Sequence, residues 1–145
     1  MYRVLIPVDT DEERARKQIE TLESLPEPAE PIEVHVLHVY EEITTPADEA
    51  GSAPIEDLNE SLDELRNRPE SVEWVIEALE AMDIDPFLHE LVDEPVDGIL
   101  STAREIDADT ILVGIRERTP IGKVVFGSVS QQVIHRSDRP VLIAR

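Results

Sequence analysis

The chain has 145 residues, no cysteine and a formal net charge of -20, from 33 acidic and 13 basic side chains. This length suits one domain with its own core. The lack of cysteine excludes disulfide and thiolate chemistry. The acidic balance argues against nucleic acid as a binding partner, because its phosphates need a basic surface. The apolar runs are far shorter than the roughly 20 residues of a membrane-spanning helix, and the first residues lead directly into a strand pattern, so we expect a cytoplasmic protein that contacts no membrane.

The N-terminal part of the sequence alternates between strand and helix patterns. Residues 3–8 form a short apolar run that predicts a buried strand. Thr10 and Glu13 match a capping box, and apolar residues then recur at helical spacing. Residues 32–40 make the strongest β-branched run of the chain and predict a second strand. Residues 41–54 are polar and contain a glycine and two prolines, which predicts a mobile loop.

The rest of the sequence continues this alternation. The predicted elements are an apolar helical face over residues 55–82 that Pro69 should kink or split, a strand over 87–92, a helix starting near Pro95, a strand over 109–113, a helix that Ser128 opens through a capping box with Gln131, and a strand over 141–144. Gly98 falls inside the helix after Pro95, where we expect close packing. Five strands separated by helical sequence predict an α/β fold, a doubly wound open parallel sheet with helices on both faces.

The carboxyl ends of the strands are where such sheets bind ligands, at the point where the strand order reverses. Asp9 follows the first strand and Gly114 the fourth, so we expect both at this edge. A glycine at a strand exit allows positive φ and close approach of a ligand. The Gly127-Ser128 pair opens a helix, and the free N–H groups there favour an anion. The sequence therefore predicts a phosphate cradle.

Each of these residues also has a purely structural interpretation. Asp9 either accepts hydrogen bonds from a ribose or an adenine edge or helps to start the first helix. Gly114 serves the turn after the fourth strand or the approach of phosphate, and Ser128 caps the last helix whether or not it binds phosphate. His35 and His38 lie three residues apart in a strand and therefore on opposite faces, so we interpret them as structural.

Other ligand and catalytic motifs are missing from the sequence. There is no G-x-G-x-x-G fingerprint, and Gly122-Lys123 lacks the surroundings of a Walker loop. The nucleophile elbow G-x-S-x-G is absent, and carboxylates and histidines do not show metal-ligand spacing. The pattern therefore predicts no catalyst.

The order of short motifs along residues 2–145 resembles the universal stress protein family. These motifs are Ile6-Pro7-Val8-Asp9, then His38-Val39, then the signature G-x2-G-x9-G-[S/T] with its following Pro-Val-Leu strand, present as Gly114, Gly127-Ser128, Val129 and Pro140-Val141-Leu142. The resemblance implies one universal stress protein domain over residues 1–145, with a fold of the adenine nucleotide alpha hydrolase-like type and a sheet order of 3-2-1-4-5. In the nucleotide-binding branch of the family, it implies ATP in the crevice between strands one and four.

The resemblance also implies a set of nucleotide contacts: Pro7, Val8, Asp9, Val39, Val113, Gly114, Arg116, Gly127, Ser128 and Val129. One position departs from the family signature, because Glu117 stands where its second glycine would be. A carboxylate there fills space and repels phosphate, since two unit charges about 4 Å apart repel by about 1 kcal/mol in water and about 4 kcal/mol at an effective dielectric of about 20. We therefore expect binding of ATP with Mg to be weakened or lost, unless the loop turns Glu117 outward.

Three functions of different class follow from these observations. We favour a non-catalytic, homodimeric stress-response or regulatory module with a degenerate adenine-nucleotide site. The alternatives are an ATP-binding, nucleotide-dependent switch and a weak ATP-hydrolysing enzyme.

The C-terminal strand and the charge give two further expectations. We expect a homodimer through Val141, Leu142 and Ile143, because an apolar edge strand leaves backbone groups unpaired. Lys17 and Lys123 are the only lysines. An acidic, lysine-poor surface is typical of salt-accumulating organisms, in which salt screens the self-repulsion, so we expect a halophilic archaeon as the source. The alternative is an acidic protein of a mesophile.

Overall fold

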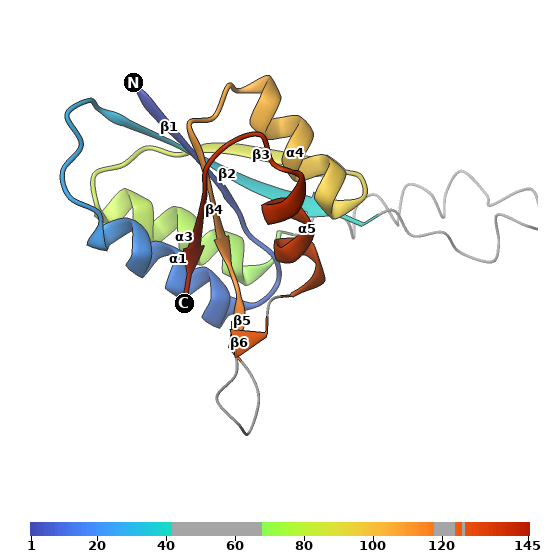
Figure 1. Ribbon diagram of the computed structural model, residues 1–145. Coiled ribbons are helices and arrows are strands. Elements are labelled where there is room, and N and C mark those ends of the chain that lie inside the picture. Colours follow the sequence, from blue (N-terminus) through green and yellow to red (C-terminus); the bar gives the residue numbers. More distant parts are fainter. Residues whose placement is uncertain (42–67, 118–123, 126) are drawn as a thin grey trace, which may run out of the picture.

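The chain folds around a five-stranded parallel sheet (Figure 1). The structure, a computed structural model, describes residues 1–41, 68–117, 124–125 and 127–145. The strands of the sheet are β1 (Tyr2–Pro7), β2 (Ile32–Tyr40), β3 (Phe87–Val92), β4 (Thr110–Gly114) and β7 (Val141–Ala144). They lie in the order β3-β2-β1-β4-β7 with every neighbouring pair parallel, so the predicted order 3-2-1-4-5 is confirmed.

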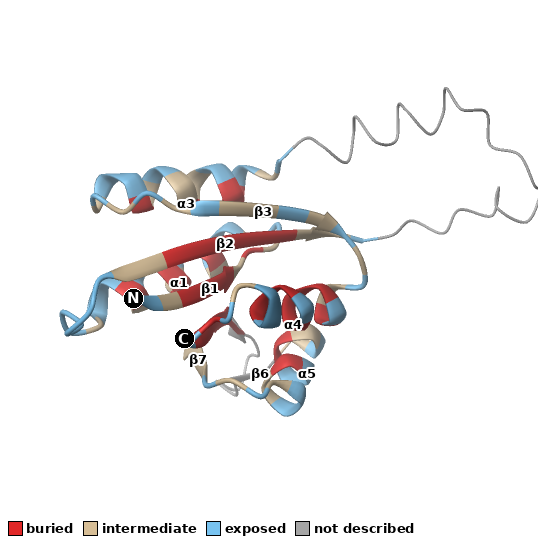
Figure 2. Ribbon diagram, turned by 90° about the horizontal axis from the view of Figure 1, so that it is seen from above, coloured by how far each residue is buried: buried red, intermediate tan, exposed pale blue. Residues whose placement is uncertain are grey.

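Helices cover both faces of the sheet (Figures 1 and 2). The helices α1 (Glu12–Ser24) and α3 (Glu70–Ala81) pack on one face, and α4 (Pro95–Glu105) and α5 (Ser128–Arg136) pack on the other. A short antiparallel pair, β5 (Arg116–Glu117) and β6 (Val124–Val125), projects beyond β4 and was not predicted from the sequence. None of the helices in the described segments is long and apolar enough to cross a membrane.

The two-residue period of the strands divides the core into two apolar layers. On β1, the side chains of Val4 and Ile6 pack with α1 and α3, whereas Leu5 packs with α4. All three are fully buried. Figure 2 shows β1 and β2 buried between the helical layers, while the edge strand β3 is partly exposed. Burial on both faces explains why these strands appear in the sequence as continuous apolar runs rather than as alternating patterns.

The predicted helix caps were wrong by one residue. The N-cap of α1 is Asp11, whose carboxylate accepts a hydrogen bond from the Arg14 N–H at 3.1 Å, and not Thr10. An aspartate caps as well as a threonine, and Asp11 is the extended residue that directly precedes the first helical residue, Glu12. The N-cap position of α5 is Gly127, with no side-chain hydrogen bond, and Ser128 is already the first helical residue. The predicted capping box at Ser128 was therefore wrong.

The predicted element boundaries need smaller corrections. β1 begins and ends one residue earlier than residues 3–8, and β4 lies one residue later than residues 109–113. Pro69 occupies the N-cap position of α3, so this helix starts directly after the proline. The residues before it on which the predicted kink or split depends lie outside the described part of the chain. The helical face predicted over residues 55–67 and nearly all of the loop predicted over residues 41–54 lie outside the described residues.

β1 and β4 separate before they reach their carboxyl ends. Their paired residues stop at Leu5 and Ile111. Beyond this point the amide of Gln18, from α1, lies between the two strands, where its Nε2 donates to the carbonyl of Pro7 at 2.7 Å and to that of Leu112 at 3.0 Å. The Gln18 side chain is buried. The separation of the strands opens a crevice at the switch point of the sheet.

Candidate functional site

A pocket of about 480 Å³ opens at the carboxyl ends of β1 and β2. Residues at the end of β4, in the β1–α1 connection and in α1, α4 and α5 complete its walls. The volume falls within the roughly 300–1,000 Å³ of typical small-molecule sites. The pocket also lies where doubly wound sheets bind their ligands, which makes it the candidate functional site.

Most of the predicted site residues line this pocket: Pro7, Val8, Asp9, Val39, Val113, Gly114 and Val129. The other three are their neighbours along the chain. Gly127 and Ser128 form the start of α5 immediately before Val129, and Arg116 lies in β5, two residues after Gly114. The fold therefore brings the first strand, the fourth strand and the last helix to one edge of the sheet.

The Asp9 carboxylate lies at the pocket and is hydrogen-bonded within the chain. Its Oδ1 accepts from the backbone N–H of Asp11 at 2.9 Å, and its Oδ2 accepts from Nη1 of Arg14. The hydroxyl of Ser71 donates to the Asp9 carbonyl and ties this turn to α3. The Asp9 side chain is still 47% exposed, so it shapes the turn before α1 and also retains accessible oxygen atoms.

Gly114 is needed for close packing and not for a turn. It is the last residue of β4, paired with Ala144, and its backbone is not left-handed. A Cβ at this position would overlap with Cγ of Arg14 and would lie 2.8 Å from its Cδ. The Arg14 side chain therefore rests directly on the glycine backbone, which corrects the prediction of a strand-exit turn. The Gly114 carbonyl accepts a hydrogen bond from the Ser130 hydroxyl at 2.7 Å, and this bond ties β4 to α5.

Two aromatic residues of β2 add polar groups to the pocket. His38 is buried, and its Nδ1 lies 2.7 Å from the Val8 carbonyl. A carbonyl only accepts hydrogen bonds, so this nitrogen carries the proton. The Tyr40 ring meets the His38 ring edge-on, with centroids 4.6 Å apart. Burial raises the pKa of the Tyr40 phenol, and the negative charge of Glu90 adds to the shift, so Tyr40 remains protonated at neutral pH.

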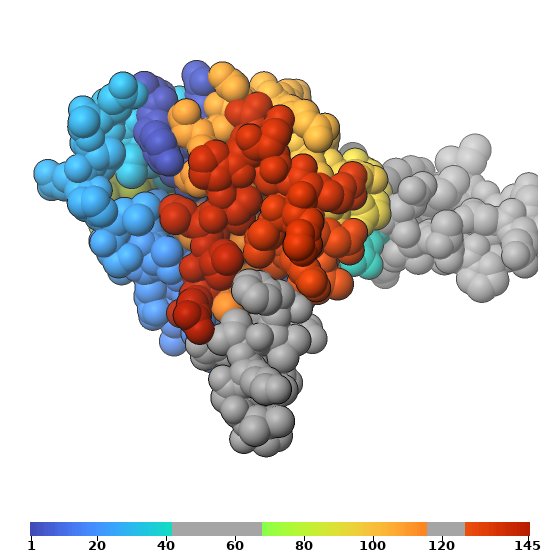
Figure 3. Space-filling view, viewed as in Figure 1, coloured from blue at the N-terminus to red at the C-terminus, as the bar shows by residue number. Residues whose placement is uncertain are grey.

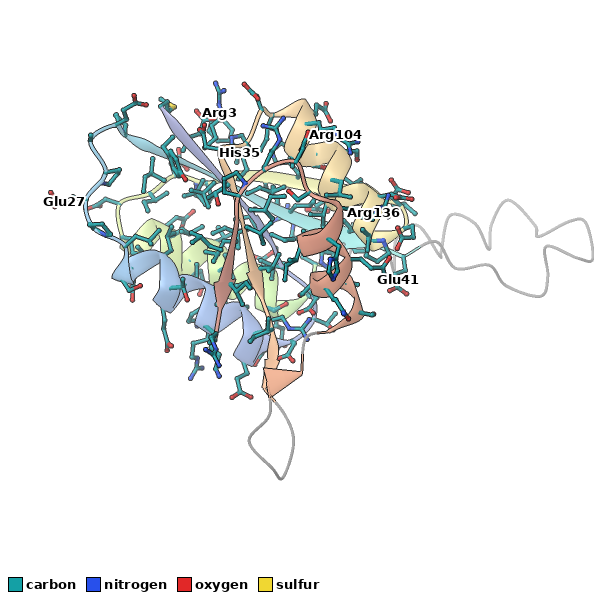
Figure 4. All side chains as sticks on the ribbon, in the orientation of Figure 1. Arg3, Glu27, His35, Glu41, Arg104 and Arg136 are labelled. Atoms are coloured by element: carbon teal, nitrogen blue, oxygen red, sulfur yellow. The ribbon has the colours of Figure 1, made fainter. Side chains whose placement is uncertain are left out.

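A second polar cluster lies nearer the amino-terminal ends of β1 and β2. His35 Nδ1 is 2.8 Å from His89 Nε2, and His35 Nε2 is 2.6 Å from a Glu33 carboxylate oxygen, to which Arg3 also donates at 3.2 Å. Figure 4 labels Arg3 and His35 in this region. The hydrogen bond from His35 lowers the pKa of Glu33, against the opposing effect of burial and with further help from Arg3. Burial lowers the pKa of His89, and the charge of His35 lowers it further.

Residues 1–145 match the sequence model of the universal stress protein family. The chain belongs to this family. A curated relative, the stress response protein NhaX of Bacillus subtilis (strain 168), is 40% identical over 52 residues, which is 36% of this chain and 31% of that protein. The curated relatives are thus matched over only about a third of their own length.

Solved universal stress protein structures share the fold of this family member. The universal stress protein from Archaeoglobus fulgidus aligns with a TM-score of 0.67 and 27% identity, covering 100% of this chain and 99% of that chain. The structure of the universal stress protein from Archaeoglobus fulgidus in complex with dAMP aligns with a TM-score of 0.65 and 24% identity, covering 100% of this chain and 98% of that chain. The likeness supports the doubly wound fold.

The pocket of this universal stress protein also contains residues that were not predicted as contacts: Thr10, Arg14, Leu37, His38, Tyr40, Glu41, Pro95, Ile99 and Ser130. One sequence signal could have identified Arg14. It lies in the first turn of α1, where the helix dipole disfavours a positive charge. A cation at such a position needs an anionic partner, and Asp9 supplies one. Several of the other lining residues, such as Thr10, His38 and Ser130, are sequence neighbours of predicted contacts, whereas Pro95 and Ile99 of α4 are identified only by the fold.

Proposed function

We propose that this universal stress protein is a regulatory module that binds an adenine nucleotide without catalysing its conversion. The observation that carries the proposal is the pocket at the switch point, with apolar walls from Val8, Val39 and Val113 and the accessible carboxylate of Asp9. Apolar walls suit a flat base, and a carboxylate accepts hydrogen bonds from ribose hydroxyls or from the amino group of adenine. The dAMP complex of the Archaeoglobus fulgidus protein supports an adenine nucleotide as the ligand class.

In this proposal the phosphate end of the nucleotide points toward the start of α5. The N–H groups of Gly127, Ser128 and Val129 belong to the first turn of this helix, where backbone donors and the helix dipole favour an anion. Arg116 adds a positive charge nearby in the sequence. Glu117, in place of the signature glycine, leads us to propose that ATP with Mg binds more weakly than a monophosphate.

Hydrogen bonds at the pocket support binding rather than turnover. An activated nucleophile donates its proton to a neighbouring base, whereas the Ser130 hydroxyl donates to the Gly114 carbonyl. The protonated Nδ1 of His38 is likewise engaged by the Val8 carbonyl. Both side chains therefore serve the architecture of the pocket, and we infer that a bound nucleotide acts as a signal.

The edge strand β7 supports the further proposal of a homodimer. Among the described strands it pairs only with β4, and Figure 3 shows C-terminal residues, coloured red, on the molecular surface. Val141, Leu142 and Ile143 are half-buried, and a second copy would cover them and satisfy the unpaired strand edge. We propose that this dimer works in the cytoplasm of a salt-accumulating organism, where the charge of -20 is screened.

Isothermal titration with AMP, ATP and GMP in concentrated KCl tests the nucleotide proposal. We expect one AMP per chain with submillimolar affinity, weaker binding of ATP, and weaker binding of GMP, because guanine carries a carbonyl at the position of the adenine amino group. Val129→Phe fills the pocket and should abolish binding. The control is Val92→Phe, at a valine of β3 that is 50% exposed, and it should leave nucleotide binding intact.

Two results would contradict the proposal. Failure of every adenine nucleotide to bind would remove the assigned ligand class. Steady hydrolysis of ATP that Asp9→Ala abolishes would replace a binding module with an enzyme.

A further inference from the structure

Arg14 occupies the place where the three predicted nucleotide-binding segments meet. Its Nη1 donates to the Asp9 carboxylate after β1, and its aliphatic carbons lie on the backbone of Gly114 at the end of β4. A Cβ on Gly127, before α5, would lie 3.6 Å from its Nη2. One guanidinium group is therefore shared by the strand ends and by the start of the last helix.

The Arg14 guanidinium has donor capacity that the described part of the chain does not use. Its Nε is buried, and no acceptor among the described residues receives its hydrogen bond. The side chain is only 14% exposed. A buried charged donor without an acceptor is unfavourable, so the Arg14 guanidinium lowers the stability of the ligand-free fold. A ligand with several acceptor oxygens would remove this destabilisation.

Phosphate is the ligand chemistry that fits this donor arrangement. A guanidinium presents its N–H groups as a planar fork that binds two oxygens of a phosphate at once. The neighbouring start of α5 adds backbone N–H groups, which favour the same charge. Asp9, the present partner of Arg14, is 47% exposed, so it can turn toward a ribose while the guanidinium turns to the phosphate.

We propose that Arg14 binds the phosphate of an adenine nucleotide in this pocket, and that its guanidinium then exchanges the hydrogen bond to Asp9 for hydrogen bonds to phosphate oxygens. The inference rests on the proposed function and assigns the specificity of the same pocket. The phosphate closest to the ribose is then recognised by a side chain that packs against Gly114, and the carbons of that side chain fill the space over this glycine. The pocket therefore distinguishes a nucleotide from its nucleoside.

The test is a comparison of adenosine and AMP by isothermal titration with the full chain. The wild type should prefer AMP over adenosine by about ten- to a hundredfold, as for a charged, two-point hydrogen bond. Arg14→Gln, which loses the charge, should reduce this ratio to nearly one. Arg14→Lys keeps the charge but loses the fork, so its ratio should lie between the two.

Arg16→Gln is the matched control. It removes the same charge from the same helix, but Arg16 is exposed and lies over the ring of Trp74, 5.8 Å from its centroid, and not at the pocket. Its AMP-to-adenosine ratio should equal that of the wild type. Raising the KCl concentration should lower the wild-type ratio, because salt screens a charge-based preference.

The outcomes separate this inference from the proposed function. Equal affinity of the wild type for AMP and adenosine, or a wild-type ratio in Arg14→Gln, overturns the role of Arg14 while nucleotide binding stands. If Arg14→Gln does not fold, an unchanged ratio in Arg14→Lys overturns it instead. Failure of both ligands to bind overturns the proposed function and this inference with it.

Discussion

Replacing Gln18 by leucine tests whether one buried amide holds the two halves of the sheet together at the crevice. The change keeps the approximate size of the side chain but removes the donor that both the Pro7 and the Leu112 carbonyls receive, at 2.7 and 3.0 Å. A buried carbonyl that loses its donor costs about 1–3 kcal/mol. The bond to Leu112 is buried and the bond to Pro7 is partly buried, so the two losses together destabilise the fold by up to about 2–6 kcal/mol before compensation.

Two gains offset part of this loss. Gln18 Oε1 is buried and accepts no hydrogen bond within the described residues, so its removal is favourable, and leucine buries more apolar surface. Together these gains recover about 2 kcal/mol. We expect a net destabilisation of about 2 kcal/mol, and at most about 4 kcal/mol. For a domain of this size that lowers the melting temperature by about 4–8 °C.

Thermal unfolding followed by circular dichroism at a fixed KCl concentration measures this effect. Gln131→Leu is the control, because Gln131 is exposed on α5. It should melt with the wild type to within about 1 °C, as surface substitutions usually do. A Gln18→Leu variant that melts at or above the wild-type temperature would refute the argument that this amide bridges the separated strands.

Three further predictions follow from the surface charge, the edge strand and the histidine pair. The melting temperature should rise steeply with KCl because salt screens the charge of -20; a protein that is fully stable in millimolar salt contradicts the halophilic proposal. Leu142→Lys should convert the expected dimer to a monomer in sedimentation experiments, and an unchanged dimer would exclude β7 as the interface. The lowered pKa of His89 means that the fold favours the neutral form of this side chain. The unfolding free energy should therefore be highest above pH about 6.5, and it should fall as the pH drops toward the lower folded-state pKa. His89→Gln should flatten that fall and His135→Gln, an exposed control, should not; equal slopes in both variants would argue against the histidine pair as its origin.

The strand order and most element positions could be predicted because the sheet is buried on both faces. Residues 32–40, 87–92 and 141–144 are strands with the predicted bounds, since apolar or β-branched runs of this kind have few alternatives in a short segment. The pair β5 and β6 was missed because strands of two residues show no period.

The details of the pocket could not be predicted, because they depend on contacts between distant residues. Thr10 and Asp11 are both good caps, and the choice between them depends on how the chain leaves β1. Gly114 was assigned to a turn, but the reason for a glycine is the Arg14 side chain, 100 positions earlier in the sequence, that lies against it. A pattern along the chain carries no sign of such a contact.

Gly98 does not line the pocket, but it affects the width of the pocket. A Cβ there would lie 3.0 Å from Leu91 Cδ1 and from Val39 Cγ2, so the absence of a side chain sets how closely α4 approaches β2 and β3. The next residue, Ile99, belongs to the wall of the pocket. One added methyl group behind that wall would push the helix outward by a few tenths of an ångström and change the width available to a base. Members of such a fold can therefore acquire new ligand preferences through substitutions hidden beneath a helix, while every group that contacts the ligand stays the same.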